Sequence, residues 1–551
     1  MNRIVLVRRS EGAVEAREPG ADPATVTGLA AEEVADFVRE RERSPVRWVW
    51  DDTTRWYPGL LADGVRVERC TDLRLAHAVL RRSPFVDQAQ VTGEDTAGWD
   101  ALAPVTGTDS ALFPLDDPAD RLDPVAELDR QQAAVAASPQ RGRLGLLLAA
   151  ESSGALAAAE MTHAGLPWRA DVHDALLAEL LGPRPAAGQR PAVLERLAAE
   201  IRTALRAPDL NPDSPGALLR ALQAAGLPVT DTRSWTLEQL DHPVVPPLLE
   251  YKKLSRLMAA NGWAWLDTWA RSGRFRSWFV PGGVVTGRWA SNGGGALSVP
   301  TQVRPAAVAD EGWRFVVADV AQLEPRVLAG MSGDAAMAEA ARSTDLYQGM
   351  VASGAVATRA EAKVGMLGAM YGGTRGESGR MMPRLTRRYP RAIGLVEEAA
   401  RAGERGEVVH TLLGRGSPRP TGAWAERAVG LGEPPEDAGP RDEQDRHRRA
   451  WGRFTRNFVV QGTGAEWALC WLADLRNRLW RLAEAGRVEE RPHLVFFLHD
   501  EVVVHTPAAL AEDVAAAVRR AAAEAGRLLF GSFPVDFPLD VAVVRSWADA
   551  D

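Results

Sequence analysis

Two aspartates lie at the ends of apolar strand patterns, where their carboxylates could hold divalent metal ions. Asp319 follows the apolar run FVVA at residues 315–318, and Asp500 lies between two apolar, β-rich runs. Carboxylate oxygens are hard ligands of the kind that Mg²⁺ prefers. If the strands are neighbours, the two carboxylates can bridge a pair of metal ions about 4 Å apart, the arrangement that phosphoryl transfer needs. Each aspartate alone has an ordinary interpretation, as a helix cap or as part of a hairpin turn.

A second group of side chains recurs every four residues, which predicts a slowly drifting stripe on one face of a helix. Its members are Arg359, Lys363, Leu367 and Tyr371. A guanidinium and an ammonium one turn apart can clamp triphosphate oxygens, and an aromatic ring further along can stack on a base. Gly365 and Gly368 weaken such a helix by about 1 kcal/mol each relative to alanine. Close approach of a ligand or of another helix would explain them, and so would plain packing.

The charge around this stripe is positive, although the whole chain is acidic. The formal net charge of −8 by itself argues mildly against nucleic-acid binding. Between residues 359 and 391, Glu361 and Glu377 oppose eight basic side chains. These are Arg359, Lys363, Arg375, Arg380, Arg384, Arg387, Arg388 and Arg391. The positive excess could meet phosphates, or the segment could be an ordinary solvated helix face.

Composition predicts a soluble globular protein of several domains. With 551 residues, at about 100–200 per domain, we expect three or four folded units. Hydrophobic residues make up 46% and charged residues 25%, an ordinary globular balance. The two cysteines are far apart in sequence, and no Cys/His cluster indicates structural zinc. No apolar run reaches the roughly 18 residues of a membrane span, and Ile4–Val7 is too short for a signal peptide, so we expect a cytoplasmic protein.

Periodicity predicts the elements that must position these residues. Strands are expected at residues 4–7, 47–50 and 314–318, and residues 493–507 are expected to form two strands around a tight turn. Helices are expected at residues 73–80, 144–165, 246–262 and 451–479. Residues 106–122 and 414–445 are rich in Pro, Gly and acidic residues and are expected to be loops.

Three segments together resemble the polymerase motifs of the family A (DNA polymerase I type) DNA polymerases. Residues 315–334 (FVVADVAQLEPRVLAGMSGD) resemble motif A, residues 359–372 (RAEAKVGMLGAMYG) resemble motif B, and residues 495–507 (VFFLHDEVVVHTP) resemble motif C. They occur in the family order, and Asp500 follows Asp319 by 181 positions. One such match could be chance, whereas three in order are hard to explain that way. The similarity runs from about Leu144 to the C-terminus.

The resemblance implies an α/β (α+β) multidomain protein with the right-hand palm, thumb and fingers fold. It also implies a DNA-templated DNA polymerase that uses two Mg²⁺ ions, with Mn²⁺ as a possible substitute. Asp319 and Asp500 match the metal-binding catalytic pair, and Glu501 matches a further metal-site position. Arg359 and Lys363 match positions that hold the triphosphate of a dNTP, and Lys363 could protonate pyrophosphate as general acid.

Other residues match supporting positions of the family. Glu324 matches the steric gate that excludes a ribose 2′-hydroxyl. Further nucleotide-binding positions are Gln322, Leu367 and Tyr371. DNA-binding positions are Arg288 in the stretch Thr286-Gly287-Arg288, Arg256 of the thumb, Arg453, Asn457 and Gln461 of a palm helix, and His499. Arg326 matches a supporting position, and Asp345-Leu346-Tyr347 resembles the start of the fingers.

The same resemblance predicts the domain boundaries and partners. Residues 1–143 would form a ribonuclease H-like, exonuclease-type domain, 144–285 a linker helix and thumb, 286–345 the first part of the palm, 346–450 the fingers and 451–551 the rest of the palm. We expect no separate 5′-nuclease domain, because few residues precede the exonuclease-like part. We expect a monomer, associated with the nucleoid, that binds primer-template DNA and dNTPs and no membrane.

Several positions depart from the family pattern. Val320 stands where the family usually has Tyr, Pro325 follows the steric-gate residue, and Leu367 replaces an aromatic side chain near the incoming sugar. The stretch at residues 373–390 is short, which predicts trimmed fingers. These changes keep the catalytic residues but affect the surroundings of the nucleotide, so we hypothesise an error-tolerant or specialised polymerase.

The N-terminal region lacks the acids of a proofreading exonuclease. Residues 55–80 resemble the second exonuclease motif, yet Tyr57 or a neighbour stands where a catalytic Asp belongs. No Asp-x-Glu follows the first strand, and RQQAAVAAS at residues 130–138 lacks the Tyr and Asp of the third motif. Asp51, Asp52 and Asp72 are acidic but are not at the motif positions. We therefore expect no metal-dependent proofreading.

Two other functions stay open at this point. A catalytically weak DNA-binding protein could use the hand as a clamp, but exposed paired carboxylates would give it no advantage. A metal-dependent nuclease could act through the N-terminal region, which the missing acids disfavour.

Overall fold

The computed structural model describes residues 2–9, 13–18, 25–105, 118–186, 188–373, 376–420, 440–484 and 486–550. The chain divides into two compact units. The first consists of Met1–Ala164, Trp278–Asn292 and Gly312–Val543, and the second of Gly165–Ser277, Gly293–Glu311 and Val544–Asp551. Most of the second unit lies within the predicted linker and thumb segment, residues 144–285. The predicted domain boundaries themselves stay predictions.

The N-terminal sheet is built around β1 (Asn2–Arg8), whose apolar residues 4–7 are buried, as in a strand covered on both faces. Its strand order is β3 (Thr25–Leu29), β2 (Val14–Glu18), β1, β4 (Val46–Trp50) and β5 (Cys70–Asp72). β1 is antiparallel to β2 and parallel to β4, and β4 is parallel to β5. The strands predicted at residues 4–7 and 47–50 are confirmed.

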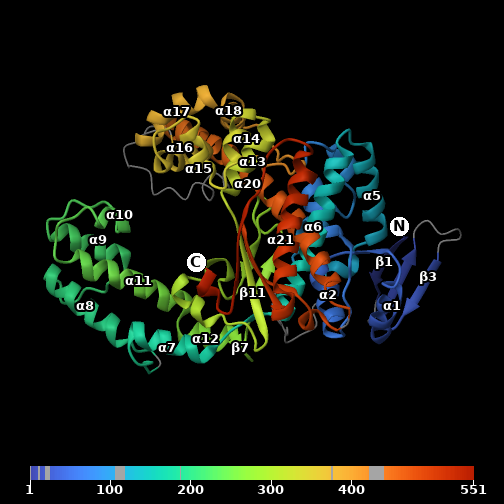
Figure 1. Ribbon diagram of the computed structural model, residues 1–551, viewed down its shortest axis with the longest axis horizontal. Helices are drawn as coiled ribbons and strands as arrows, with labels where there is room; N and C mark the ends of the chain where they lie inside the picture. The colour runs from blue at the N-terminus through green and yellow to red at the C-terminus, as the bar shows by residue number, and fades with distance from the viewer. Residues whose placement is uncertain are drawn as a thin grey trace. The chain divides into compact units, whose positions relative to one another are not determined.

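Six helices accompany this sheet in the N-terminal part of the described chain (Figure 1). They are α1 (Val34–Arg41), α2 (Thr53–Ala62), α3 (Leu73–Leu80), α4 (Thr96–Ala101), α5 (Pro124–Ala137) and α6 (Arg141–Ala164). The predicted helices at residues 73–80 and 144–165 are confirmed. Gly165 follows α6 with a φ of +71°, a left-handed conformation that suits glycine at a helix end. Of the predicted loop at residues 106–122, residues 106–117 lie outside the described residues.

Among the described residues, α6 alone is long and apolar enough to cross a membrane by length and composition. Of its most apolar window, 67% is buried inside the structure. The helix packs against α2, β5 and β12, and its buried residues include Leu144, Leu147 and Leu156. A core helix of this kind passes the same test, so the finding is weak evidence for a membrane span.

The second unit is mainly helical. Its helices are α7 (Ala170–Leu181), α8 (Ala192–Leu205), α9 (Pro215–Ala224), α10 (Ser234–Leu237), α11 (Val245–Asn261) and α12 (Trp263–Trp269), and its strands are β6 (Leu166–Pro167), β7 (Ala270–Arg271) and β8 (Arg274–Phe275). α11 packs against α8 through an apolar face that includes Leu248 and Leu254, with Leu197 and Ile201 in the same core. The predicted helix at residues 246–262 is confirmed, with Gly262 just beyond its end.

A second sheet in the first unit has the order β12 (His493–Leu498), β13 (Glu501–Pro507), β11 (Trp313–Val320) and β14 (Leu539–Val544). β13 is antiparallel to both β12 and β11. The two strands predicted at residues 493–507 and the strand at 314–318 are confirmed. A separate antiparallel pair is formed by β9 (Trp278–Val280) and β10 (Ala290–Asn292).

The long helix α20 (Pro440–Arg481) packs against α21 (Ala511–Phe530) beside the second sheet (Figure 1). The predicted helix at residues 451–479 is therefore confirmed. The prediction that the preceding loop extends to residue 445 is wrong, because residues 440–445 are helical. Residues 421–439 lie outside the described residues, and the helix has begun at Pro440. Proline suits the first turn of a helix because its missing N–H would have no partner there in any case.

Six shorter helices complete the described part of the first unit. They are α13 (Leu323–Ser332), α14 (Ala335–Ala341), α15 (Leu346–Ala352), α16 (Arg359–Tyr371), α17 (Gly376–Arg388) and α18 (Pro390–Glu404). α16 packs against α17, and α18 packs against α20. Aspartates begin two of these helices, since Asp334 accepts hydrogen bonds from the first N–H groups of α14 and Asp345 from those of α15.

A buried ionic network joins the N-terminal part of the first unit to α20. Glu160 on α6 accepts hydrogen bonds from the Tyr57 hydroxyl (2.7 Å) and from Arg476 on α20, and its carboxylate lies 3.4 Å from Arg66. Burial alone would raise the pKa of Glu160, but the charges of Arg476 and Arg66 hold it below its usual range. The buried guanidiniums of Arg66 and Arg476 thus share the Glu160 carboxylate as their counter-charge.

Replacing Glu160 with alanine is expected to lower the free energy of unfolding by about 3 kcal/mol, because two buried cations lose their counter-charge. The urea midpoint at neutral pH measures the effect. The matched control is Glu524→Ala, which removes the partner of exposed Arg527 on α21 and should cost less than about 1 kcal/mol. Equal losses in the two variants would contradict a central role for the network.

Candidate active site

The two motif aspartates come together where β11 ends and β13 begins. The strand register places Asp319 directly opposite Glu501. The Val320 N–H donates to the Asp500 carbonyl at 3.0 Å, so the backbones that carry the two aspartates are hydrogen-bonded to each other. His499 and Asp500 form the two-residue turn between β12 and β13, with His499 at a φ of +56°. The sequence interpretation that paired Asp319 with Asp500 across adjacent strands matches this placement.

Burial shifts the pKa values of the two side chains in this turn, His499 and Asp500. It raises the pKa of Asp500 to about 6, against the opposing charge of Arg288. It also lowers the pKa of His499 to about 4, and Arg288 lowers it further. His499 is therefore neutral near pH 7, where it can accept or donate a hydrogen bond, and Asp500 is mostly ionised. A cation bound near Asp500 would stabilise its charged form.

The donor set at this turn fits a magnesium ion by its chemistry. Asp319 is exposed and Asp500 is half-buried, and both offer the carboxylate oxygens that Mg²⁺ prefers. Glu501 is buried, with 8% of its surface exposed. Among the described residues no three His, Cys, Asp or Glu side chains are gathered as a metal site, so the fit rests on the two aspartates.

The predicted stripe on α16 is present. All four side chains are exposed, and they lie on the same side of the helix: Arg359, Lys363, Leu367 and Tyr371. Thr358 caps the helix by accepting a hydrogen bond from the Glu361 N–H. The two glycines have a packing explanation, because a Cβ at Gly365 would lie 3.0 Å from Leu385 and one at Gly368 would lie 2.5 Å from Ser378, both on α17.

The end of this stripe is bonded to the start of α13. The Tyr371 hydroxyl donates to Glu324 at 2.7 Å, and Arg288 forms an ion pair with the same carboxylate. Burial and the charge of Glu324 raise the pKa of Tyr371 above its usual range, so the phenol keeps the proton that it donates. Three residues that were assigned separately from sequence thus form one network.

The start of the stripe is held by an acidic side chain. Asp345 accepts from Arg359 Nε at 2.5 Å, and the Arg359 guanidinium lies 5.7 Å from the centre of the Tyr347 ring. The ion pair with Arg359 lowers the pKa of Asp345 although partial burial opposes this. Because this contact uses Nε, the two terminal nitrogens of the Arg359 guanidinium are left to face a ligand. The sequence analysis placed Asp345 at the start of the fingers but did not predict this pair.

Two residues with predicted supporting positions make structural bonds. Gln322 accepts from the Leu346 N–H at 3.0 Å. Arg326 is fully buried and donates to backbone carbonyls around residues 321, 341, 343, 344 and 536. Burial lowers the pKa of Arg326 to about 10, so it stays charged. In this structure both side chains hold the segment before α15 against α13, and a nucleotide-binding role for Gln322 stays a prediction.

The predicted DNA-binding residues of α20 form a row. Arg453, Asn457 and Gln461 follow one another at steps of four and are all partly exposed. A Cβ at Gly372, at the end of α16, would lie 2.6 Å from Arg453, so the two helices approach closely here. The Asn457 side-chain oxygen is buried and has no hydrogen-bond partner among the described residues. These placements are compatible with a nucleic-acid interface.

Sequence analysis missed the buried carboxyl that anchors α20. Glu466 accepts hydrogen bonds from the Thr411 hydroxyl and from the Leu413 N–H (3.0 Å). Burial raises the pKa of Glu466 to about 7, against these bonds and the charge of Arg415. Arg415 in turn forms an ion pair with Glu151 of α6. The sequence did contain a signal for this buried acid, because Glu466 is the single charged residue in the otherwise small and apolar run of residues 464–472.

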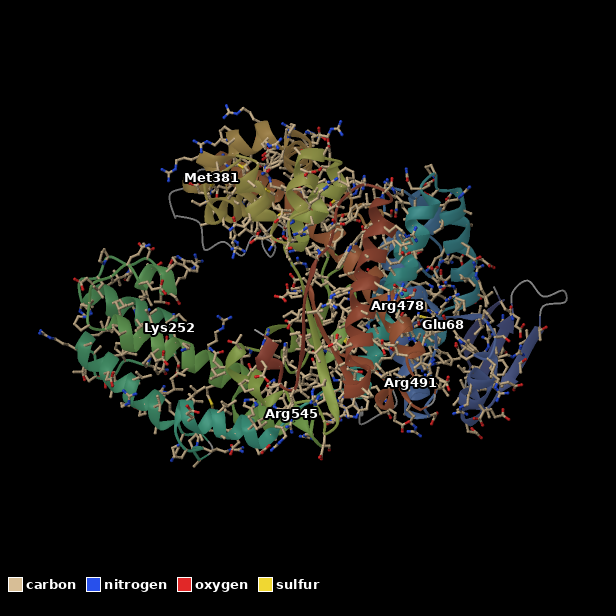
Figure 2. The ribbon with its side chains drawn as sticks, viewed as in Figure 1. Glu68, Lys252, Met381, Arg478, Arg491 and Arg545 are labelled. Carbon is tan, nitrogen blue, oxygen red and sulfur yellow. The ribbon has the colours of Figure 1, made fainter. Side chains whose placement is uncertain are left out.

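Arg256 belongs to the second unit. It is exposed on α11, next to a cavity of about 430 Å³ that Lys252 (Figure 2) and Lys253 also line. Lys252 donates to the Thr232 carbonyl at 2.6 Å, and Lys253 lies 3.7 Å from Glu250. The predicted basic residues therefore lie together on this helix, and their role in binding DNA stays a prediction.

Comparison with known proteins decides the family. The family described as DNA polymerase family A matches residues 189–549, well over half of the chain. The chain belongs to the family A DNA polymerases. The sequence resemblance is thereby confirmed.

Individual relatives agree with the family match. A thermostable DNA polymerase I from Thermus filiformis is 28% identical over 342 residues, covering 56% of this chain and 37% of that protein. A DNA polymerase I from Chloroflexus aurantiacus is 27% identical over 321 residues, covering 52% of this chain and 31% of that protein. The chain thus spans about a third of the length of the curated relatives it matches.

A solved structure extends the likeness in fold over the whole chain. The POL domain of Pol1 from M. smegmatis, solved in complex with DNA primer-template and dNTP, has a TM-score of 0.68 and 20% identity, covering 100% of this chain and 95% of that one. The α/β multidomain polymerase fold predicted from sequence is confirmed. That the N-terminal part of this family A chain is exonuclease-like stays a prediction.

The N-terminal acids of this family A polymerase are engaged in structural bonds. Asp51 accepts from the Trp56 indole at 2.5 Å, Asp52 pairs with Arg74 at 2.7 Å, and Asp72 accepts from the Thr53 N–H at 2.8 Å. All three are buried. Burial raises the pKa of Asp51, and burial together with the charge of Asp52 raises the pKa of Asp72 to about 6. Their oxygens cap helices and neutralise an arginine.

Glu466→Gln should change how stability depends on pH. From the ordinary pKa of 4.5 up to about 7, the folded carboxyl keeps a proton that the unfolded one has lost, so its contribution to stability is complete below pH 4.5 and is lost as the pH rises through 7. Glutamine cannot ionise. The variant should therefore gain up to about 3 kcal/mol on the wild type between pH 4.5 and 8.

Urea midpoints at several pH values measure this difference. Glu524→Gln, at a partly exposed position of α21, is the control. The hydrogen-bonded ion pair with Arg527 lowers the pKa of Glu524, so this variant should show no gain on the wild type as the pH rises from 4.5 to 8. A constant difference for Glu466→Gln would show that this carboxyl ionises at the same pH in the folded and in the unfolded protein.

Proposed function

We propose that this family A chain is a DNA-templated DNA polymerase that adds deoxynucleotides to a primer 3′ end. The observation that carries the proposal is the register of β11 and β13, which brings Asp319 and Asp500 to one strand end. A protein that only binds DNA has no use for two carboxylates there. The exposed cations of α16 belong to the same compact unit and supply charge for a triphosphate.

The chemistry divides among a few side chains. Asp319 and Asp500 would hold Mg²⁺, for which Mn²⁺ would substitute, and the metal supplies charge stabilisation at the attacking and leaving oxygens. Arg359, oriented by Asp345, and Lys363 bind the triphosphate oxygens. Lys363 Nζ carries the proton that the departing pyrophosphate takes up.

Sugar selection would depend on the Glu324 network. Arg288 and Tyr371 hold this carboxylate from two sides, so it cannot easily move away from a 2′-hydroxyl. The exposed Leu367 offers the incoming nucleotide a smaller, non-aromatic surface than the family norm. We therefore keep the hypothesis of relaxed base fidelity and attribute it to Leu367 and the short fingers.

We further propose that this chain does not proofread and acts as a monomer in the cytoplasm, close to the nucleoid. The support for missing proofreading is local. Arg8 at the end of β1 lies over the Trp56 ring at 4.7 Å, and Asp51 and Asp52 are bonded to Trp56 and Arg74. Arg8 and Arg74 thus add positive charge beside these acids, which disfavours binding of a metal ion by them.

Asp500→Ala should abolish primer extension and leave the affinity for primer-template DNA within about twofold, because the carboxylate serves the chemical step. A gel-based extension assay and fluorescence anisotropy measure the two effects. Asp513→Ala, at an exposed position in the first turn of α21, is the control and should extend normally.

Two outcomes would contradict the proposal. Wild-type protein that binds primer-template but never extends it would favour a DNA clamp. Extension that survives Asp500→Ala would place the chemistry elsewhere.

Proofreading is tested separately on a primer with a mismatched 3′ end. We expect no Mg²⁺-dependent shortening in the absence of dNTPs, with a proofreading polymerase as positive control. Shortening that Asp51→Ala or Asp52→Ala abolishes would prove that these acids hold metal after all.

A further inference from the structure

A cavity of about 470 Å³ lies within the first unit beside α21, and we call it the α21 cavity. Its walls come from α21, from residues 342–344 after α14 and from residues 531–538, which join α21 to β14. Among the described residues that line it, none was assigned above to metal, nucleotide or DNA. Its volume falls in the range of about 300–1,000 Å³ that is typical of sites for small ligands.

The helix α21 opens the cavity by placing two small residues between two arginines. The four positions share one side of the helix by their spacing: Arg519, Ala523, Gly526 and Arg527. Ala523 has only a methyl group and Gly526 has no side chain, so the space between the guanidiniums stays open. Gly526 also lets Phe537 approach, since a Cβ there would lie 3.0 Å from its ring. The two arginines are about 12 Å apart along the helix axis, the length of a small ligand.

The other walls of the α21 cavity are held in place by hydrogen bonds. The buried Arg326 donates to the Thr344 carbonyl at 2.8 Å and to the Asp536 carbonyl at 3.1 Å. The Ala321 N–H donates to the Pro538 carbonyl at 3.1 Å. These bonds fix both segments that face α21, so the cavity is formed before a ligand arrives. A preformed cavity loses less conformational entropy on binding than one that must first be ordered.

Three guanidiniums line the cavity and are available to an anion. Arg342 Nε lies 3.3 Å from Glu339, and Arg527 pairs with Glu524. Both pairs are accessible to solvent, and pairs of this kind contribute little stability, so a phosphate can replace the carboxylate. Arg519 forms no ion pair among the described side chains. The planar guanidinium fork suits bidentate contacts with phosphate oxygens.

The cavity also presents a carboxylate and an apolar wall, which an inorganic anion would not use. Asp536 is exposed, and its carboxylate accepts hydrogen bonds but repels a negative charge. Phe533, Pro534 and Pro538 supply apolar surface that can cover a ring. A ligand that uses all three features carries phosphate oxygens, N–H or O–H donors and a flat ring.

We propose that the α21 cavity binds a nucleoside phosphate. The phosphate groups contact the three guanidiniums, those of Arg342, Arg519 and Arg527. The base lies against Phe533, and Asp536 accepts a hydrogen bond from the base or the sugar. This site is additional to the stripe on α16, and it is independent of the proposed polymerase function.

The test measures the affinity of guanosine diphosphate and of inorganic pyrophosphate by isothermal titration calorimetry, without DNA or metal ions. Guanine carries N–H donors that a carboxylate can accept. Arg342→Ala/Arg519→Ala should weaken both ligands about tenfold or more, because two charge-assisted contacts with phosphate are lost. Asp536→Ala should weaken guanosine diphosphate several-fold, since an acceptor is lost. The same variant should bind pyrophosphate more tightly, since a repelling charge is removed.

Matched variants complete the design. Arg520→Ala removes an exposed arginine of α21 that does not line the cavity, and it should change neither affinity. Lys363→Ala, on the stripe of α16, should keep the affinity for guanosine diphosphate within twofold. Melting curves verify that each variant is folded.

Three results would overturn the proposal. The first is that the wild type binds no guanosine diphosphate at millimolar concentration. The second is that Lys363→Ala abolishes this binding while Arg342→Ala/Arg519→Ala keeps it, which would assign the nucleotide to the stripe on α16. The third is that Asp536→Ala binds both ligands more tightly, which would show that the cavity takes anions without recognising a nucleoside.

Discussion

Residues directly opposite each other in an antiparallel pair project from the same face, so the register of β11 and β13 decides which side chains can share a ligand. A slip of one residue would turn Asp319 to the other face of the sheet. The buried apolar partners of both strands oppose such a slip, because Val316, Val317 and Ala318 would lose their places beside Val502, Val503 and Val504. The buried apolar residues of the two strands thereby fix the register that brings Asp319 opposite Glu501 and next to Asp500.

The chain uses similar carboxylates in two ways, and their partners make the difference. Asp52 and Asp72 are fully buried and are satisfied by Arg74 and by backbone N–H groups, so they stabilise the N-terminal part. Asp500 lies in a turn, where burial raises its pKa and Arg288 only partly opposes the shift. A group left in that state gains from a cation that arrives with the substrate. A buried carboxylate with protein partners stabilises the fold, whereas a buried carboxylate without enough of them favours the binding of a cation.

Much of this arrangement is visible in the sequence because it is local. The strand ends at Asp319 and Asp500, and the stripe that includes Arg359, follow from apolar runs and steps of four residues. The pair Asp345–Arg359 and the anchoring of Glu466 by Thr411 could not be predicted, because each joins residues whose contact depends on tertiary packing. The start of α20 at Pro440 was missed since a Pro- and acid-rich stretch also describes a helix N-terminus.

The helix α16 connects these local and tertiary effects. Its glycines cost helix propensity, yet they allow α17 to approach closely and so fix which side of α16 stays exposed. The exposed side then carries Arg359 and Lys363, the proposed triphosphate ligands, at one end and Tyr371, bonded to Glu324, at the other. Val320 and Leu367 depart from the family without touching this bond. Any loosened selectivity would therefore concern the fit of the base and sugar surface, while Glu324, the proposed steric gate, is held in place by Arg288 and Tyr371.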